Sequence, residues 1–447
     1  MRYYSTNGKA PLADLRTAVV SGLAPDRGLY MPENIQRLPA EFFDNIQNLS
    51  FQEIAFEAAK AFFGGDVAED ELERIVYETL AFDCPVVHVD GDIWTLELFH
   101  GPTLAFKDVG ARFMARLLRY FTEKDGKNGG PLNVLVATSG DTGSAVANGF
   151  LGVRGIRVFV LYPKGKVSPI QECQFTTLGQ NITAVEIDGV FDDCQTLVKN
   201  AFMDRDLCSK MALTSANSIN VARFLPQSFY YFYAYAQMKK AGKADNLVVC
   251  VPSGNFGNIC SALFAQRMGL PVKRFIAANN SNDVFYKYIR TGKYEPAPSI
   301  QTLANAMDVG DPSNFARIMA LYGSDWSAVK ALVDSDRVSD AQIEAGIREC
   351  FDACGYVLDP HGACAYLALK RGLKEGETGV FCETAHPAKF KATVDRILND
   401  GAERMPGGVE IPGRLAAFMK GEKKSVSLSK NYDEFKAFLL SKDTVTF

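Results

Sequence analysis

The segment 246-NLVVCVPSGNFGNICSALFAQRMG-269 decides the fold class of this chain of 447 residues. A run of apolar residues (NLVVCV) leads into a glycine-rich turn (PSGNFGN) and then into a stretch of helical composition (ICSALFAQRMG). A short, continuous apolar run bounded by turn residues is typical of a strand that is buried on both faces. The segment therefore predicts a buried strand that passes through a glycine loop into a helix.

The same order of strand, polar loop and helix recurs along most of the chain. Apolar runs at 132–138 (LNVLVAT), 156–163 (IRVFVLYP) and 182–188 (ITAVEID) each lead into a helical stretch, and RFIAANN and GVFCETA end in polar loops. This alternation predicts an α/β fold with mostly parallel open sheets and helices on both faces. Because ligands bind such sheets at the carboxyl ends of the strands, the loops that follow the strands are the candidate site.

Residues 1–90 follow a different, mainly helical pattern. The stretch SFQEIAFEAAKAFFG at 50–64 opens with a Ser and carries a Glu three residues later, which is the signature of a capping box. No reactive side chains are concentrated in this part of the sequence. We therefore expect an N-terminal, mainly helical accessory domain that packs against the α/β part.

Charge and hydropathy exclude several classes of protein. Lys and Arg total 48 and Asp and Glu total 52, a formal net charge of −4, whereas nucleic-acid binders usually carry a basic domain or stripe. No apolar run approaches the roughly 20 residues of a membrane helix. The first residues, MRYYSTNGKAPLADLR, lack the apolar stretch of a secretory signal. We expect a cytoplasmic globular protein with neither a nucleic-acid nor a membrane partner.

Ten cysteines in a chain of this length do not indicate a disulfide framework, which belongs to small secreted domains. Four residues, Cys350, Cys354, His361 and Cys364, could supply zinc ligands. Their spacing lacks the paired short C-x₂₋₄-C knuckles of structural zinc sites, and Cys350 and Cys354 fit one face of a helix. The sequence therefore favours buried reduced thiols and no metal.

Two glycine loops follow predicted strands, TSGDTGSA at 138–145 and SGNFGN at 253–258. Glycines let the backbone approach a ligand closely, and the free N–H groups of the next helix favour an anion. Neither loop matches the dinucleotide pattern G-x-G-x-x-G or the triphosphate pattern G-x₄-G-K-[S/T]. One such loop is a weak signal, but two in one chain favour a ligand that carries phosphate.

Lys107 lies in GPTLAFKDVGARFMARLLRYF at 101–121, which predicts a turn into an amphipathic helix with Thr103 as its cap. Most helix lysines are solvated. A lysine near a helix start and beside apolar neighbours has a lowered pKa through desolvation and the helix dipole. Such an amine suits Schiff-base chemistry. Together with a phosphate-binding loop, Lys107 indicates pyridoxal phosphate.

The segment TSANSINVARF at 214–224 gathers Ser, Asn and Arg side chains within ten residues. Its composition alone favours a turn and a helix cap, where Asn and Ser are common. The alternative is an oxyanion-binding patch with Arg223 as its charged, fork-shaped donor.

Four motifs in this order, FHGPTLAFKD, ATSGDTGSA, PSGNFGN and CETAHPAKF, resemble the threonine synthase family. The element APDRGLYMP at 24–32 resembles the longer branch of that family, which occurs in fungi and many bacteria. The resemblance spans nearly the whole chain, and the four ordered motifs make it specific.

The resemblance implies the pyridoxal-phosphate fold type II, which is tryptophan-synthase β-like and has two mostly parallel open-sheet domains. The accessory domain would cover 1–90, the large cofactor-binding domain 91–130 and 240–447, and the smaller inserted α/β domain 131–239. The cofactor implied is pyridoxal 5′-phosphate. The reaction implied converts O-phospho-L-homoserine and water to L-threonine and phosphate.

The resemblance also implies roles at the cofactor. Lys107 would be the catalytic residue, forming a Schiff base with the cofactor and moving protons between the substrate carbons. The loop 254–258 would hold the cofactor phosphate, and Thr384 would hydrogen-bond the pyridine nitrogen. The cofactor-binding residues are then Lys107, Asp141, Gly254, Asn255, Phe256, Gly257, Asn258 and Thr384.

Two further segments would contact the substrate. The SGDTG loop would line the substrate carboxylate and the cofactor 3′-hydroxyl, and the N-S-x-N-x-x-R pattern that ends at Arg223 would bind the substrate phosphate. Shorter family members carry Asn at the position of Asp141, which leaves the protonation of this carboxylate open. The substrate-binding residues implied are Ser139, Thr142, Gly143, Asn217, Ser218, Asn220 and Arg223.

Two alternatives stay open at the level of the sequence. One is a related phospho-lyase or dehydratase that releases a 2-keto acid, because the partition depends on the timing of water addition and proton transfer. The other is a non-catalytic, threonine-synthase-like binding protein, although Lys107 and the intact SGNFGN loop argue against it. The oligomeric state is open between a homodimer and a monomer.

Overall fold

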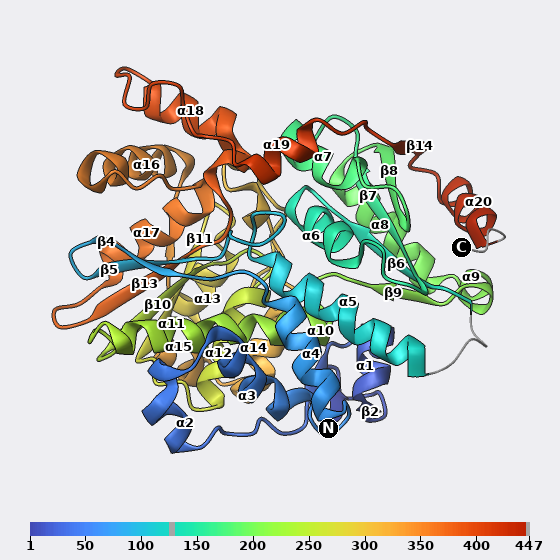
Figure 1. The fold of residues 1–447 in the computed structure, drawn as a ribbon, viewed down its shortest axis with the longest axis horizontal. Helices are drawn as coiled ribbons and strands as arrows, with labels where there is room; N and C mark the ends of the chain where they lie inside the picture. Colours follow the sequence, from blue (N-terminus) through green and yellow to red (C-terminus); the bar gives the residue numbers. More distant parts are fainter. Residues whose placement is uncertain (125–129, 444–447) are drawn as a thin grey trace.

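The structure is a computed structural model that describes residues 1–124 and 130–443. Two open β-sheets with flanking helices lie side by side in Figure 1, and the N-terminal helices, drawn in blue, cover the lower side of the molecule in that view. A third, small sheet of three strands lies in the N-terminal segment, in the order β2-β1-β3. Its strands are β1 (Arg2–Ser5), β2 (Ala13–Asp14) and β3 (Tyr30–Pro32).

The largest sheet has six strands in the order β12-β11-β10-β13-β5-β4. Neighbouring strands run parallel, except that β4 and β5 form an antiparallel pair at one edge. The strands are β4 (Val86–Asp90), β5 (Ile93–Glu97), β10 (Leu247–Pro252), β11 (Arg274–Asn279), β12 (Val333–Arg337) and β13 (Thr378–Glu383).

The second sheet has five strands, all parallel, in the order β14-β8-β7-β6-β9. Its strands are β6 (Leu132–Ala137), β7 (Ile156–Pro163), β8 (Ile182–Asp188), β9 (Leu213–Ser215) and β14 (Ser425–Ser429).

Helices connect the strands and cover the sheets. The short 3₁₀ helices are η1 (Ile46–Asn48), η2 (Leu225–Gln227), η3 (Asn305–Met307) and η4 (Pro387–Phe390). The α-helices are α1 (Leu15–Ser21), α2 (Ala40–Asn45), α3 (Phe51–Phe63), α4 (Glu69–Thr79), α5 (Lys107–Lys124), α6 (Asp141–Phe150), α7 (Pro169–Thr176), α8 (Phe191–Met203), α9 (Arg205–Lys210), α10 (Val221–Phe224), α11 (Ser228–Lys240), α12 (Gly257–Arg267), α13 (Val284–Thr291), α14 (Phe315–Leu321), α15 (Trp326–Leu332), α16 (Asp340–Cys354), α17 (Pro360–Gly372), α18 (Lys391–Asn399), α19 (Gly413–Met419) and α20 (Tyr432–Asp443).

Strand β6 shows why these segments form central strands. Successive side chains of a strand point to opposite faces. Val134 and Val136 belong to the core that contains α6, whereas Leu135 and Ala137 belong to the core that contains α8 and α20. Both faces are therefore apolar and covered by helices, as expected for a parallel sheet. The predicted α/β class with mostly parallel sheets is confirmed.

The C-terminal strand β14 joins the sheet of the segment expected to form the smaller domain. Strands β6 to β9 lie within 131–239, the segment expected to form the smaller domain. Strand β14, from the C-terminal segment, pairs in parallel with β8 of the same sheet, with Ser425 opposite Ala184 and Ser429 opposite Asp188. The division into domains stays a prediction, and this pairing favours assigning the C-terminal segment to the smaller unit.

The N-terminal segment packs against the large unit through helix α3. The capping box predicted for this helix is present: Glu53 N–H donates to Ser50 Oγ, and the backbone N–H of Ser50 donates to the Glu53 carboxylate at 2.7 Å. The Phe51 ring stacks on Tyr233 of α11, with centroids 4.5 Å apart and planes 11° from parallel. Helix α11 is thus covered by the N-terminal segment.

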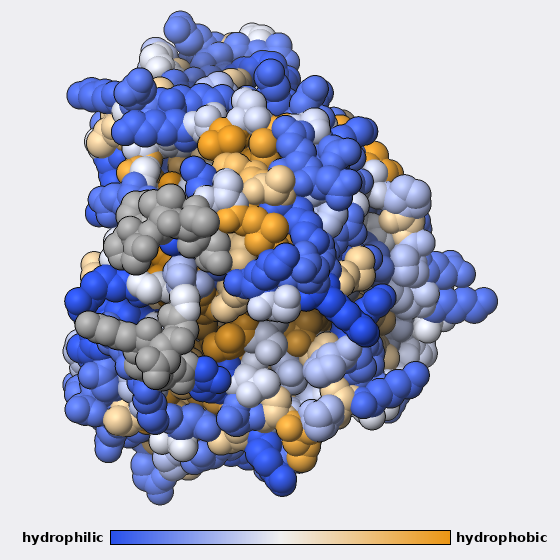
Figure 2. Space-filling model, turned by 90° about the vertical axis from the view of Figure 1, so that its right-hand side faces the viewer, coloured by the Kyte–Doolittle hydropathy of each residue, from blue (hydrophilic) through white to orange (hydrophobic). Residues whose placement is uncertain are grey.

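Hydrophilic side chains cover most of the face shown in Figure 2, and the apolar residues visible there form small patches between them. Most large apolar side chains are used inside the three cores. The exposed exceptions come from separate segments of the chain and include Leu12, Tyr77, Val190, Met203, Ile300 and Met419.

Arg317 of α14 is fully buried and joins the N-terminal segment to the large unit. Its Nε and Nη2 atoms donate to the carbonyl of Tyr30 in β3 at 3.2 and 3.1 Å, and Nη2 also donates to the carbonyl of Ile219. Its Nη1 atom donates to Asn314 Oδ1 at 2.7 Å, and the guanidinium carbon lies 4.1 Å from the centroid of the Phe224 ring. Burial lowers the pKa of Arg317 to about 9. One charged side chain therefore ties three segments together.

We expect Arg317→Met to lower the free energy of unfolding by about 3 kcal/mol, because buried carbonyls left without donors cost roughly 1–3 kcal/mol each. Urea or thermal unfolding followed by circular dichroism measures the change. Arg2→Met is the matched control, since the Arg2 side chain is 70% exposed and its ion pair with Glu33 lies at the surface, where such pairs contribute little. Equal losses in the two variants would contradict the role given to Arg317.

Candidate active site

Three of the loops singled out from the sequence follow the carboxyl ends of strands. The SGDTG loop follows β6, the SGNFGN loop follows β10, and Thr384 follows β13. The backbone N–H of Phe106 donates to the carbonyl of Thr384 at 2.9 Å, and Ala105 pairs with Ala385 in an isolated bridge. The start of α5 therefore lies against the end of β13, where a ligand of an α/β sheet is expected.

Lys107 is the first residue of α5. The sequence placed the helix cap at Thr103, and this was wrong: Thr103 instead donates to the Asp108 carboxylate, from its N–H at 2.8 Å and from its hydroxyl at 2.6 Å. Phe106 lies beside the Lys107 amine, with its ring centroid 4.6 Å from Nζ. The Lys107 side chain is only 16% exposed, and burial lowers its pKa. The lowered pKa expected from the sequence is thus found.

Asp141 lies next to Lys107, with 3.9 Å between Oδ2 and Nζ. Its Oδ1 atom is 2.6 Å from Nζ of Lys389 and accepts a hydrogen bond from Gln171 Nε2 at 2.9 Å. Burial alone would raise the pKa of Asp141, but the Lys389 and Lys107 charges outweigh it and hold that pKa below its usual range. The Asp141 carboxylate is therefore charged and shared between two lysines.

The SGNFGN loop forms a cradle of backbone groups. Phe256 adopts the left-handed conformation at φ 62° directly before α12 begins at Gly257. A Cβ on Gly254 would lie 2.7 Å from the Met307 Cα, so the loop has no room for a side chain there. Within the described residues, the backbone N–H groups of 254–256 donate no hydrogen bond. Together with the first N–H groups of α12, which have no partner inside the helix, they are donors of the kind that can bind an anion.

Asn258 is held by two tyrosines of α11. The hydroxyls of Tyr230 and Tyr231 donate to Asn258 Oδ1 at 2.5 and 2.7 Å. The Nδ2 atom of Asn258 is buried and has no hydrogen-bond partner among the described residues. An amide donor oriented in this way and left free is available to a ligand.

The segment 214–224 lies against the SGNFGN loop. Asn255 Nδ2 donates to Ser218 Oγ at 2.8 Å, and a Cβ on Gly257 would lie 3.2 Å from the Ser218 Cβ. Asn217 and Ser218 are both half-buried. The two segments that the sequence linked to separate phosphates are therefore neighbours.

Arg223 is 2% exposed. It lies against Gly110, which follows Lys107 by about one turn of α5: a Cβ on Gly110 would come within 3.3 Å of Arg223 Nε. Its Nη1 atom donates to the carbonyl of Ala216, while Nε is buried without a partner. No ion pair among the described residues includes Arg223, and burial lowers its pKa to about 10. A buried guanidinium with a free donor fits an anion.

Asn220 differs from its neighbours, because the chain itself uses its side chain. Its Nδ2 atom donates to the carbonyls of Val19 at 2.8 Å and Ser215 at 3.2 Å, and its Oδ1 accepts from the N–H of Ala222 at 3.0 Å, which caps α10. The helix-cap interpretation of this position therefore holds for Asn220.

The SGDTG loop is ordered by Thr138, whose hydroxyl accepts hydrogen bonds from the N–H groups of Gly140 and Gly143 at 2.9 and 2.8 Å. A Cβ on Gly143 would lie 2.4 Å from the Thr138 Cγ2. Gly143 is therefore needed for the close packing of this turn against Thr138. Ser139 and Thr142 are half-buried, and within the described residues their hydroxyls form no hydrogen bond.

Thr384 follows Glu383, whose pKa is raised by burial and by the Asp359 carboxylate. The Thr384 side chain is buried, and no hydrogen bond of the described residues involves its hydroxyl. The hydroxyl is therefore available to a ligand.

Sequence reasoning missed Lys389, Gln171 and the tyrosine pair at 230–231. Lys389 stands in the motif CETAHPAKF, and its apolar surroundings were a signal for burial. Gln171 lies in α7, where no local pattern marks it. Tyr230 and Tyr231 follow Arg223 by seven and eight residues, but aromatic side chains at helical spacing indicate packing rather than a contact with the site. The side chains considered for zinc are engaged within the fold: Cys350 and Cys354 share a face of α16, and His361 Nδ1 lies 2.5 Å from Asp359 Oδ1.

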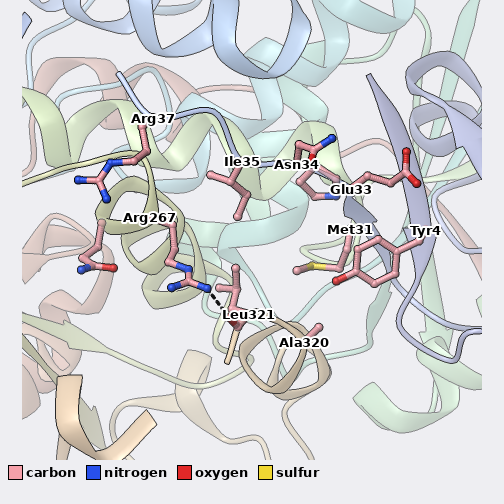
Figure 3. A pocket seen from close by; sticks show the side chains of 11 residues that line it. Tyr4, Met31, Glu33, Asn34, Ile35, Arg37, Arg267, Ala320 and Leu321 are labelled. Carbon is pink, nitrogen blue, oxygen red and sulfur yellow. Dashed lines mark hydrogen bonds between the residues drawn. The ribbon is translucent and has the colours of Figure 1, made fainter. Parts of the chain in front are cut away.

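A surface cavity of about 460 Å³ lies elsewhere, between the N-terminal segment and helices α12 and α14 (Figure 3). Arg267 lines it and donates to the carbonyl of Leu321 at 3.0 Å. None of the loops described above contributes to its walls. The cavity is therefore separate from the candidate active site.

The site fits pyridoxal phosphate on the observations above. Lys107 offers a buried amine that can bond to an aldehyde, the 254–257 cradle suits a phosphate, and the free Thr384 hydroxyl suits a ring nitrogen.

Among the helices that the structure describes, none combines the length and apolar character needed to cross a membrane.

Comparison with known proteins agrees with this chemistry. A family model described as pyridoxal-phosphate dependent enzyme matches 77–383, and models of the threonine synthase N terminus and C-terminal region match 2–80 and 362–439. The chain is 42% identical to the threonine synthase of Serratia marcescens over 98% of its length and 99% of the relative's.

Solved structures agree equally well. The crystal structure of threonine synthase from Escherichia coli superposes with a TM-score of 0.90 at 40% identity, covering 99% of this chain and 100% of that one. The PLP-bound threonine synthase from Brucella melitensis gives 0.91 at 34% identity, covering both chains fully. The predicted fold type II architecture is confirmed. The chain therefore belongs to the threonine synthase family of pyridoxal-phosphate-dependent enzymes.

Proposed function

We propose that this chain converts O-phospho-L-homoserine and water to L-threonine and phosphate, with pyridoxal 5′-phosphate held at Lys107. The observation that carries the proposal is a buried lysine amine next to two separate anion sites. The helical turn that follows Lys107 contacts Arg223, and the segment of Arg223 contacts the 254–257 cradle. A reaction between a phosphate-bearing cofactor and a phosphate-bearing substrate needs both sites.

Lys107 is assigned the proton transfers. Bound pyridoxal phosphate supplies the electron sink that stabilises negative charge on the substrate carbons. Lys107 Nζ would take the proton from the substrate Cα, pass that proton on so that the amine is neutral again, and then take one from Cβ. Burial favours the neutral amine, because it lowers the pKa of Lys107.

The cofactor is assigned to backbone amides and neutral side chains. The N–H groups of Gly254, Asn255, Phe256 and Gly257 would hold its phosphate, helped by the free Nδ2 of Asn258. The Thr384 hydroxyl would face the pyridine nitrogen; unlike a carboxylate, it does not favour a protonated ring. Asp141 would lie near the cofactor hydroxyl.

The substrate is assigned to the other two segments. Arg223, with Asn217 and Ser218, would bind the substrate phosphate, and the hydroxyls of Ser139 and Thr142 would bind its carboxylate. For Gly143 and Asn220 we propose an indirect part, because their polar groups are used in ordering these loops.

We also propose that the protein works in the cytoplasm on this small molecule, without nucleic acid. All ten cysteines are free thiols, which suits a reducing compartment, and the net charge of −4 does not suit a nucleic-acid partner. Of the oligomeric states left open, homodimer and monomer, sedimentation of the purified protein will show which occurs.

Product analysis tests the proposal directly. The protein is loaded with pyridoxal 5′-phosphate, O-phospho-L-homoserine is added, and amino acid, keto acid and phosphate are measured. Threonine and phosphate in equal amounts are expected. Formation of a 2-keto acid would show that the protein is a phospho-lyase of the same fold. Cofactor binding without turnover would contradict the assignment of O-phospho-L-homoserine as the substrate.

We expect Gly254→Ala to raise the Kd for pyridoxal 5′-phosphate about ten-fold or more, which corresponds to about 1.4 kcal/mol. The added Cβ would lie 2.7 Å from the Met307 Cα and distort the cradle. Titration of the cofactor into the protein, followed by absorbance, measures the Kd. Gly413→Ala is the control, since a Cβ there meets no atom within 4 Å. An unchanged Kd in Gly254→Ala would remove this loop from the cofactor site.

We expect Arg223→Ala to lower kcat/KM for O-phospho-L-homoserine about 10²–10³-fold, the usual cost of removing one charge-stabilising donor. The absorbance spectrum of the bound cofactor should stay unchanged, because Arg223 is assigned to the substrate. The matched control is Arg396→Ala, whose side chain is 52% exposed and pairs with Glu344 at the surface. Full activity in Arg223→Ala would refute the substrate-phosphate assignment.

A further inference from the structure

We propose that Lys389 is a positioning residue that acts on Lys107 through Asp141. By pairing with the Asp141 carboxylate, Lys389 prevents this carboxylate from holding Lys107 as an ammonium ion. Lys107 is thereby kept available as a neutral amine. The inference rests on the part that Lys107 plays in the proposed function.

The geometry around Asp141 is asymmetric. Lys389 Nζ lies 2.6 Å from Oδ1, whereas Lys107 Nζ lies 3.9 Å from Oδ2. The Lys389 side chain is fully buried, whereas that of Lys107 is 16% exposed. Gln171 Nε2 donates to the same oxygen as Lys389, which holds the carboxylate toward Lys389. Asp141 therefore has Lys389 as its close partner, and Lys107 lies farther away.

Lys389 is fixed in this place by its own segment. It lies in η4, whose start is capped by His386: the N–H of Ala388 donates to Nδ1 of that ring at 3.1 Å. Its Nζ also donates to the carbonyl of Thr103 at 2.8 Å, four residues before Lys107. The motif that supplies Thr384 after β13 thus also supplies the cation that neutralises Asp141.

Without Lys389, the Asp141 charge would act on Lys107 alone. An opposite charge within about 4–6 Å favours the charged form of an amine, and a buried site is screened little by water. The Lys389 charge opposes this effect, and the pKa of Lys107 is lowered by burial, raised by Asp141 and lowered by Lys389. Removal of either Asp141 or Lys389 leaves the charge of the other without its close counter-charge.

The remaining charged groups around Lys107 are engaged elsewhere. Arg223 lowers and Asp359 raises the pKa of Lys107, but both rank after the Asp141 and Lys389 charges. Asp359 pairs with His361, and Asp108 is bound by Thr103. Burial raises the pKa of Glu383 and so favours its neutral form. A substitution in the Asp141–Lys389 pair is therefore expected to change the pKa of Lys107 more than a substitution of any other charged neighbour.

A charge cycle separates this electrostatic role from a structural one. The full-length protein without cofactor is labelled with acetic anhydride at a series of pH values, and peptide mass spectrometry reads the labelling of Lys107. In Lys389→Met, the Lys107 pKa should rise by at least about one unit, which lowers labelling by about ten-fold at pH values well below the pKa of Lys107 in the parent protein. In Asp141→Asn, the uncompensated Lys389 charge should lower the Lys107 pKa and increase labelling.

The double variant Asp141→Asn/Lys389→Met should bring the Lys107 pKa back near that of the parent, because both charges are gone. Lys389→Arg should also stay near the parent, since it keeps the charge. Lys370→Met is the matched control: it removes a lysine that pairs with Glu349 at the surface and is expected to change nothing. A double variant that labels like Lys389→Met would overturn the proposal.

In the holoenzyme, the pH at which the absorbance of the bound pyridoxal phosphate changes should shift in the same directions. If Lys389→Met does not fold, as judged by circular dichroism, Asp141→Asn decides alone, and unchanged labelling of Lys107 in it refutes the proposal. The labelling needs neither cofactor nor turnover. A failure of the proposed reaction is therefore distinguishable from a failure of this inference.

Discussion

The burial of the central strands on both faces is the constraint on which the rest of the structure depends. Strands such as β6 and β10 consist of buried side chains from end to end, so they offer no place for a polar site. The side chains of the candidate site are therefore found mainly in the loops at the strand ends. The SGDTG loop, the SGNFGN loop and Thr384 all follow this rule, and helix starts next to them add free N–H donors at the same places.

Three buried charged side chains in and near the site have different surroundings. Arg317 is surrounded by carbonyl acceptors and so supports the structure around it. Asp141 is compensated by Lys389 and held by Gln171. Arg223, unlike Arg317, keeps a buried donor that has no partner among the described residues, which is costly unless a ligand completes it. The contrast explains why Arg223, rather than Arg317, is assigned to the substrate although both are buried arginines.

Local patterns in the sequence revealed the groups that stand on the strand ends. Apolar runs followed by glycine loops gave the α/β class, and Lys107 was found because it stands beside apolar residues near a helix start. The helix cap at Thr103 was wrong, because a nearby buried carboxylate, Asp108, competes for that hydroxyl. Lys389 and β14 were missed because their roles depend on contacts with Asp141 and β8, which lie more than 200 residues away in the chain.

The N-terminal segment gains a physical role from these contacts. The carbonyl of Val19 accepts from Asn220, and the carbonyl of Tyr30, in the APDRGLYMP element, accepts from Arg317, which also holds the carbonyl of Ile219. Backbone groups of the accessory segment therefore fix both sides of the turn that leads into Arg223. A turn held only by its own short helix would be free to rearrange, because α10 has four residues. The accessory segment thus orders the segment that carries Arg223 through its backbone carbonyls.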